Sequence, residues 1–115
     1  MRLRHELTDV FPNGTSLKGH DTTTFDDLVE AFGYPNMIND KTCPGDKTWW
    51  EWCVEFYDPK EDEYHIAFIY DWKEIGPASA RTGKYRWHIG GKKIDSVWCV
   101  MDVLSYIHPV PAAPQ

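Results

Sequence analysis

Two segments with alternating side chains, residues 49–57 (WWEWCVEFY) and 64–72 (YHIAFIYDW), constrain the fold more than any other feature of this sequence. Each carries large apolar side chains at every second position, which is the period of a β-strand with one buried face. The polar segment DPKEDE between them is short enough for a hairpin turn. The sequence therefore predicts two antiparallel strands whose apolar face is covered by other elements.

The hydrophobic pattern also suggests a register for this hairpin, because a slip of one residue would exchange its two faces. The register that makes one face wholly apolar pairs Trp50 with Trp72, Trp52 with Tyr70, Val54 with Phe68, and Phe56 with Ile66. The opposite face then carries Trp49, Glu51, Glu55, Tyr57 and His65. We expect this second face to be open to water.

Two helices are predicted from apolar residues at helical spacing. The first falls within residues 24–33, with Thr24 as the cap, Gly33 as the stop, and one apolar face made of Phe25, Leu28, Val29 and Phe32. The second falls within residues 94–107, with Asp95 as the cap and one apolar face made of Ile94, Val97, Trp98, Met101, Leu104 and Ile107. Both faces are expected to cover the sheet.

A third strand is predicted at residues 84–89 (KYRWHI), and a short one at residues 15–19, whose place in the sheet the sequence leaves open. These elements predict an α+β fold, a small two-layer sandwich in which a short antiparallel β-sheet of three to four strands is covered on one face by two α-helices. One domain is expected over residues 1–108, followed by a Pro-rich tail at 109–115.

Charge and cysteine content narrow the class of function. Twelve Lys and Arg against 18 Asp and Glu leave a net charge of −6, which disfavours nucleic acid and suits a basic partner. Cys43, Cys53 and Cys99 are odd in number and lack CxxC spacing, so neither a disulfide framework nor a zinc site is indicated. No apolar run fits a signal peptide or a membrane span. We therefore expect a cytoplasmic protein without a metal or cofactor.

The first candidate site is the outer face of the predicted hairpin together with its turn. Trp49, Tyr57 and His65 form an aromatic strip there, and it is flanked by the acidic residues Glu51, Glu55, Asp58, Glu61, Asp62 and Glu63. Because Trp and Tyr supply much of the energy of protein interfaces, this composition suggests a protein-binding surface. The alternative is that these are ordinary exposed aromatic residues.

The second candidate site is the segment WHIGGKK, residues 87–93. Gly90 and Gly91 precede the predicted helix, and Lys92 and Lys93 stand beside them, so the backbone N–H groups could hold an anion. With Trp72 or Trp87 as a stacking ring, this segment would capture a nucleotide signal. A tight strand-to-helix turn that needs positive φ is favoured over an anion site.

A third hypothesis is a hydrolase that uses His88 as its base, because histidine titrates near neutrality. Nothing close to it in sequence completes a catalytic triad or a metal-ligand set. A structural role is favoured for His20, His65 and His88.

Five segments, TSLKG, LVEAFGYP, the DK…W of residues 46–50, YDWK and WHIGG, stand in an order that resembles a family of small bacteriophage-encoded proteins. The resemblance covers residues 15–100, and the chain departs from the family pattern in its longer acidic turn at 58–63 and its Pro-rich C-terminus. It implies an accessory protein of the host bacterial cytoplasm that blocks a host enzyme or a defence system. The leading hypothesis is thus a non-enzymatic inhibitor that binds a bacterial protein, with nucleotide capture and His88-dependent hydrolysis as alternatives.

Overall fold

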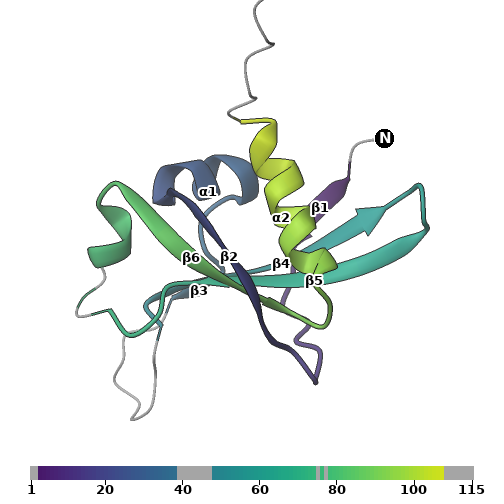
Figure 1. The fold of residues 1–115 in the computed structure, drawn as a ribbon, viewed down its shortest axis with the longest axis horizontal. Coiled ribbons are helices and arrows are strands. Elements are labelled where there is room, and N and C mark those ends of the chain that lie inside the picture. The colour runs from purple at the N-terminus through teal and green to yellow at the C-terminus, as the bar shows by residue number, and fades with distance from the viewer. Residues whose placement is uncertain (1–2, 39–47, 75, 77, 108–115) are drawn as a thin grey trace, which may run out of the picture.

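The computed structural model describes residues 3–38, 48–74, 76 and 78–107. Its centre is an antiparallel sheet in the order β1-β4-β5-β6-β2 (Figure 1). These strands are β1 (Arg4–Leu7), β2 (Ser16–Thr24), β4 (Trp50–Asp58), β5 (Glu63–Tyr70) and β6 (Lys84–Gly91), and the short β3 (Met37–Ile38) pairs with β4 beside β1. The helices are α1 (Phe25–Phe32) and α2 (Asp95–Ser105), with a 3₁₀ turn at Ser79–Arg81.

The predicted α+β class is confirmed, and both helices pack on the same face of the sheet, which we call the inner face (Figure 1). The predicted number of strands is wrong. The N-terminal segment forms β1 at the edge of β4, and the strand expected at residues 15–19 continues to Thr24 as β2 beside β6. Strand β1 was not predicted because it is short, and β2 was predicted too short because it is mostly polar, so neither shows the alternation of a half-buried strand.

The core consists of aromatic rings from both layers. Phe25 of α1 lies 5.4 Å from Trp52 and 6.5 Å from Trp87 between ring centroids, and the two indoles lie 5.4 Å apart, edge to face. Each buried indole N–H has an acceptor: Trp52 Nε1 donates to the Gly33 carbonyl and Trp87 Nε1 to the Thr23 carbonyl. The rings therefore enter the core without an unsatisfied polar atom.

Helix α1 forms as its sequence predicts. The Thr24 hydroxyl accepts a hydrogen bond from the Asp27 N–H at 3.0 Å, which caps the N-terminus. Gly33 ends the helix with φ 87°, a conformation that favours glycine. Phe25, Leu28 and Phe32 are buried against the sheet.

The predicted hairpin register is wrong by one residue. The structure pairs Glu51 with Tyr70, Trp52 with Ile69 and Val54 with Ala67. As a result the inner face of β5 carries His65, Ala67 and Ile69, and its outer face carries Tyr64, Ile66, Phe68 and Tyr70. The apolar side chains Ile66, Phe68 and Tyr70 thus lie on the outer face, whereas the prediction placed them on the covered face with Trp52, Val54 and Phe56.

The turn of the hairpin explains this register. Asp58 pairs with Glu63, so the loop between them consists of residues 59–62. The Asp58 carboxylate accepts the N–H groups of Lys60 and Glu61, at 2.9 Å and 3.4 Å. Asp62 takes the left-handed conformation, with φ 53°, and accepts a hydrogen bond from the Tyr57 hydroxyl. Turn chemistry therefore fixes the pairing, and side-chain hydrophobicity does not.

The predicted buried face of α2 is also partly wrong. The buried residues of this helix are Ser96, Val97, Cys99, Val100 and Val103. Ile94, Trp98 and Met101, which were expected in the core, have exposed fractions of 43%, 60% and 49%. The N-cap is Ile94 and not Asp95, and it makes no side-chain cap hydrogen bond.

Close approach of α2 to the sheet explains why its small side chains face inward. A Cβ on Gly19 would lie 3.0 Å from Val97, and one on Gly91 would lie 2.2 Å from the Ser96 hydroxyl. The Ser96 hydroxyl donates to the Ile66 carbonyl at 2.9 Å, where β5 separates from β6. Trp98 is too large for such a contact and stays on the solvent side.

Candidate functional site

The predicted aromatic strip of Trp49, Tyr57 and His65 does not exist as one surface. Trp49 precedes β4, where its backbone N–H donates to Asp71 and its indole Nε1 donates to the Glu74 carbonyl. Tyr57 is on the outer face and packs against Tyr64, with ring centroids 4.8 Å apart. His65 pairs with Phe56 on the inner face. The strip depended on the incorrect register.

The acidic part of the first candidate site lies at the tip of the β4–β5 hairpin. Glu61, Asp62 and Glu63 are exposed there, and Asp58 is half-buried at the base of the turn. Glu51 and Glu55 are on the outer face of β4, well along the strand from that tip. The structure therefore separates the hairpin acids from Glu51.

The second candidate site is also divided. Gly90 and Gly91 belong to β6, and neither has the positive φ that the sequence analysis expected. Gly91 faces Ser96 of α2, and Trp87 is fully buried in the core. Lys92 and Lys93 are exposed before α2 and line a different hollow, beside Tyr64 and His65. Only Trp72, His88 and Gly90 remain together, on the outer face.

A row of four side chains crosses this outer face. Glu51 of β4 pairs with Tyr70 of β5, Tyr70 with His88 of β6, and His88 with His20 of β2. Successive residues of a strand point to opposite faces, so these aligned residues share one face. The segments TSLKG, YDWK and WHIGG, far apart in the sequence, are neighbours here.

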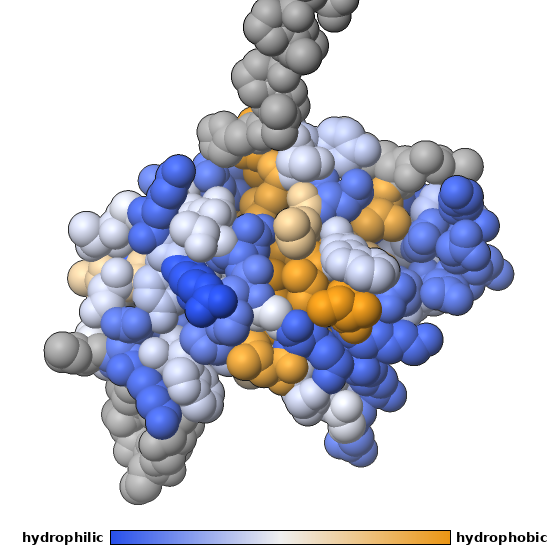
Figure 2. Space-filling view, in the orientation of Figure 1, coloured by the Kyte–Doolittle hydropathy of each residue, from blue (hydrophilic) through white to orange (hydrophobic). Residues whose placement is uncertain are grey.

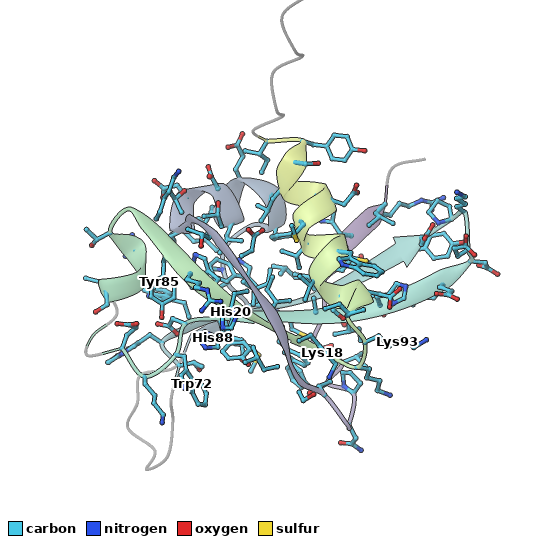
Figure 3. All side chains as sticks on the ribbon, in the orientation of Figure 1. Lys18, His20, Trp72, Tyr85, His88 and Lys93 are labelled. Atoms are coloured by element: carbon cyan, nitrogen blue, oxygen red, sulfur yellow. The ribbon has the colours of Figure 1, made fainter. Side chains whose placement is uncertain are left out.

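The rings of this row are in contact. His20 and His88 are 4.5 Å apart between centroids, and His88 stacks on Tyr70 at 5.4 Å with an interplanar angle of 28°. Trp72 stands 6.0 Å from Tyr70 and from His88. Figure 3 shows His20, His88 and Trp72 gathered on the side of the sheet away from the two helices.

Next to this row is a hollow of about 290 Å³, which we call the outer hollow. Its lining includes Leu17, Glu51, Tyr70, Trp72 and Gly90. Gly90 forms part of the floor because it has no side chain, and the nearest atoms to a Cβ there would be the Ser16 carbonyl oxygen and the Tyr70 ring, at 3.4 Å and 3.5 Å. Trp72 is 40% exposed at the rim.

Glu51 is the acidic group of the outer hollow. Burial, followed by the charge of Asp71, raises the pKa of its carboxyl to about 7. Burial and the Glu51 charge also raise the pKa of Tyr70. A carboxyl with such a pKa exchanges its proton near neutral pH and gains from any ligand that supplies hydrogen-bond donors or positive charge.

The two histidines are held in the neutral form. Burial lowers the pKa of both rings, and the Arg86 charge adds to this effect; His20 further lowers the pKa of His88. Within the part of the chain that the structure describes, His88 Nδ1 is buried and has no hydrogen-bond partner. No carboxylate or nucleophile hydrogen-bonds to either ring there, and no group of three His, Cys, Asp or Glu could hold a metal.

A separate surface lies on α2. Ile94, Trp98 and Met101 recur at i, i+4 and i+7 and share its solvent-facing side. Figure 2 shows hydrophobic side chains along this helix, flanked on one side by hydrophilic residues over the hairpin. Burial, together with the carboxylates of Asp95 and Asp58, raises the pKa of Cys99 to about 11. Asp58 of the hairpin and Asp95 of α2 therefore both lie near Cys99.

Sequence reasoning missed Tyr70 and Leu17 in the outer hollow and the exposed side of α2. A usable signal existed for the hollow, because TSLKG, YDWK and WHIGG were all noted, but their proximity follows from strand order alone. Cys43 lies outside the residues that the structure describes. Cys53 and Cys99 are buried and free, as expected of small apolar side chains.

No protein-family model, curated protein or solved structure matches this chain. In the described part of the chain, neither helix has the length and apolar character needed to cross a membrane. The function is therefore argued from the residues of this chain.

Proposed function

We propose that this protein is a non-enzymatic binder that docks the solvent-facing side of α2 onto a basic surface of a bacterial protein. The observation that carries the proposal is the row Ile94, Trp98 and Met101, which stays 43–60% exposed on a packed helix. The resemblance to bacteriophage-encoded proteins makes a host or defence protein of the bacterial cytoplasm the expected partner, and inhibition the expected effect.

The exposed helix side has the chemistry of an interface anchor. Trp98 presents a large ring at little further conformational cost, because its backbone is already fixed in α2. Met101 adds a flexible apolar side chain one turn away. Isolated exposed apolar residues are common, but three on adjacent turns of one helix form a stripe that can enter a groove.

The charges around this stripe favour a basic partner. Asp95 and Asp102 belong to α2, and Asp58, at the base of the acidic hairpin turn, is close enough to raise the pKa of Cys99 in the same helix. Lys92 and Lys93 are the basic residues at its start. With a net charge of −6 on the whole chain, association with a basic surface would be accelerated at low ionic strength.

Capture of the tagged protein from bacterial lysate, with mass spectrometry of what is retained, tests this proposal. The variant Trp98→Ala/Met101→Ala removes the stripe, and Tyr34→Ala is the control because it removes an exposed aromatic ring that belongs neither to α2 nor to the outer hollow. We expect one stoichiometric partner that the control retains and the double variant loses. Affinity for the purified partner should fall by about 30-fold or more, as for a hot-spot Trp, and should weaken with added salt.

Two results would overturn the proposal. One is a partner that binds the double variant as tightly as the natural protein while both melt at the same temperature. The other is the absence of any stoichiometric protein from the capture.

A further inference from the structure

The outer hollow is a second candidate site, independent of the α2 surface. Its residues come from four strands and the segment that follows β5: Leu17 from β2, Glu51 from β4, Tyr70 from β5, Gly90 from β6, and Trp72. Each position is set by strand pairing, so the lining is rigid apart from the rim. A hollow of about 290 Å³ lies at the small end of ligand pockets, which run from roughly 300 to 1,000 Å³.

We propose that the outer hollow binds a guanidinium group, with Glu51 accepting its paired N–H donors and the Trp72 and Tyr70 rings enclosing its plane. The group could come from a small guanidino compound or from an arginine side chain of another protein. The chemistry of recognition is the same for both sources.

A positive charge is favoured by the carboxylates. Glu51 lines the hollow, and among the residues that the structure describes its carboxylate has no hydrogen-bond partner. Asp71, buried next to it, adds a second negative charge whose effect on Glu51 is direct. A cation compensates the burial of these carboxylates, whereas a phosphate-bearing ligand would be repelled.

A planar cation fits better than a compact ammonium. Tyr70 and Trp72 meet at 67°, so they form two walls of a corner that can enclose a flat group. Guanidinium stacks on aromatic rings and pairs with a carboxylate through two parallel hydrogen bonds. The Trp72 ring already makes a cation–π contact, because the Lys73 ammonium lies 5.7 Å from the ring centroid.

Binding should depend on pH through Glu51, because only the ionised carboxylate accepts both hydrogen bonds. With a pKa of about 7, its ionised fraction rises about tenfold between pH 6 and pH 8. The other charged or titratable groups near it are Cys53 on the same strand, Tyr70 and His88 on β5 and β6, Asp71 just after β5, and Lys73 at the rim. Burial raises the pKa of Cys53 to about 12, so its thiol stays protonated over this range. Since the pKa of His88 is lowered and that of Tyr70 is raised, neither changes charge over most of this range.

Titration of the protein with agmatine, followed by the NMR signals of the Trp72 indole and the Glu51 and Tyr70 backbone amides, tests the proposal. N-acetylarginine amide represents a side chain within a protein, n-butylamine lacks the planar group, and N-acetylcitrulline amide is the uncharged planar analogue. We expect saturable shifts with agmatine that are at least tenfold weaker with butylamine and with the citrulline analogue. Affinity for agmatine should rise about tenfold from pH 6 to pH 8.

Matched variants assign the effect to the hollow. Glu51→Gln should weaken agmatine binding at least tenfold and abolish its pH dependence, and Trp72→Leu should also weaken it. Glu55→Gln removes the same charge from the same face of β4, outside the hollow, and Trp98→Leu removes an exposed Trp from the other side of the molecule. Both controls should bind as the natural protein does.

The titrations distinguish the two possible sources of the guanidinium group. Binding of both agmatine and the arginine amide supports a protein side chain as the source, and binding of agmatine alone supports a small molecule. The proposal is overturned if agmatine causes no saturable shift at pH 8, or if Glu51→Gln binds it unchanged. Loss of α2-mediated protein binding would leave these titrations unaffected.

Discussion

At the scale of single residues, Glu51 is the group whose protonation most directly links stability to pH. Its pKa of about 7 lies above the 4.5 of an exposed carboxyl, so between these values the folded state holds the proton more tightly than the unfolded state. The contribution of Glu51 to the free energy of unfolding is therefore present below about pH 4.5 and is lost as pH rises through 7.

Replacing Glu51 with Gln tests this linkage. The variant should gain stability relative to the natural protein as pH rises from 5 to 8, by about 2 kcal/mol, because the desolvated charge is gone. Urea unfolding at both pH values measures the difference. The lowered pKa values of His20 and His88 act in the opposite direction but are shared by both proteins and cancel. A difference that stays constant with pH would contradict the assignment.

Asp71 is a second residue whose role is local and structural. Its Oδ1 accepts the backbone N–H groups of Trp49 and Trp50, at 2.7 Å and 3.1 Å, and so fixes the start of β4. Asp71→Asn should cost about 1–3 kcal/mol of unfolding free energy, because a buried, charge-assisted pair of hydrogen bonds is weakened. Thermal and urea unfolding measure the cost, and Asp9→Asn at an exposed position is the control. An equal, small effect from both would refute this role.

At the scale of elements, the two glycines of WHIGG have different reasons to be glycine. Gly91 lies where a Cβ would overlap Ser96 and press on the Ile66 carbonyl, while a Cβ at Gly90 would meet only ordinary contacts. Gly91→Ala should therefore destabilise the protein by about 2–3 kcal/mol through overpacking at the start of α2. Gly90→Ala, the neighbouring control, should stay within about 1 kcal/mol.

Denaturant unfolding of the two alanine variants decides between close approach and backbone conformation as the reason. If both were equally destabilised, a shared backbone requirement would replace the packing argument. The sequence predicted such a requirement, in the form of positive φ, and the structure shows that neither glycine has it.

The elements also differ in how far local sequence specified them. Helix α1 follows from its own residues, since its cap, its apolar spacing and its stop are all local. The exposed side of α2 does not, because Trp98 and Met101 have helical spacing equal to that of the buried Val97 and Val100. Which side packs was decided by the small side chains that fit closest to the sheet.

At the scale of the whole molecule, two surfaces of different chemistry lie on opposite sides of one sheet. The α2 stripe lies on the helix side, and the outer hollow lies on the side away from the helices (Figures 1 and 3). Because the strands fix both, variants of Trp98 and of Glu51 should act independently on protein capture and on guanidinium binding. The candidate site residues predicted from sequence were distributed over both sides and over the core.

The sequence by itself determined the α+β class, helix α1, the strand character of β4, β5 and β6, and the acidic charge, because each of these depends on local periodicity or composition. Only the tertiary structure decided the hairpin register, the strand order and the side of α2 that is buried. The register depends on hydrogen bonds within the turn, at Asp58 and Asp62, which a pattern of apolar residues does not encode. The buried side of α2 depends on the space left by Gly19 and Gly91, and Gly19 meets Val97 only in the folded sheet.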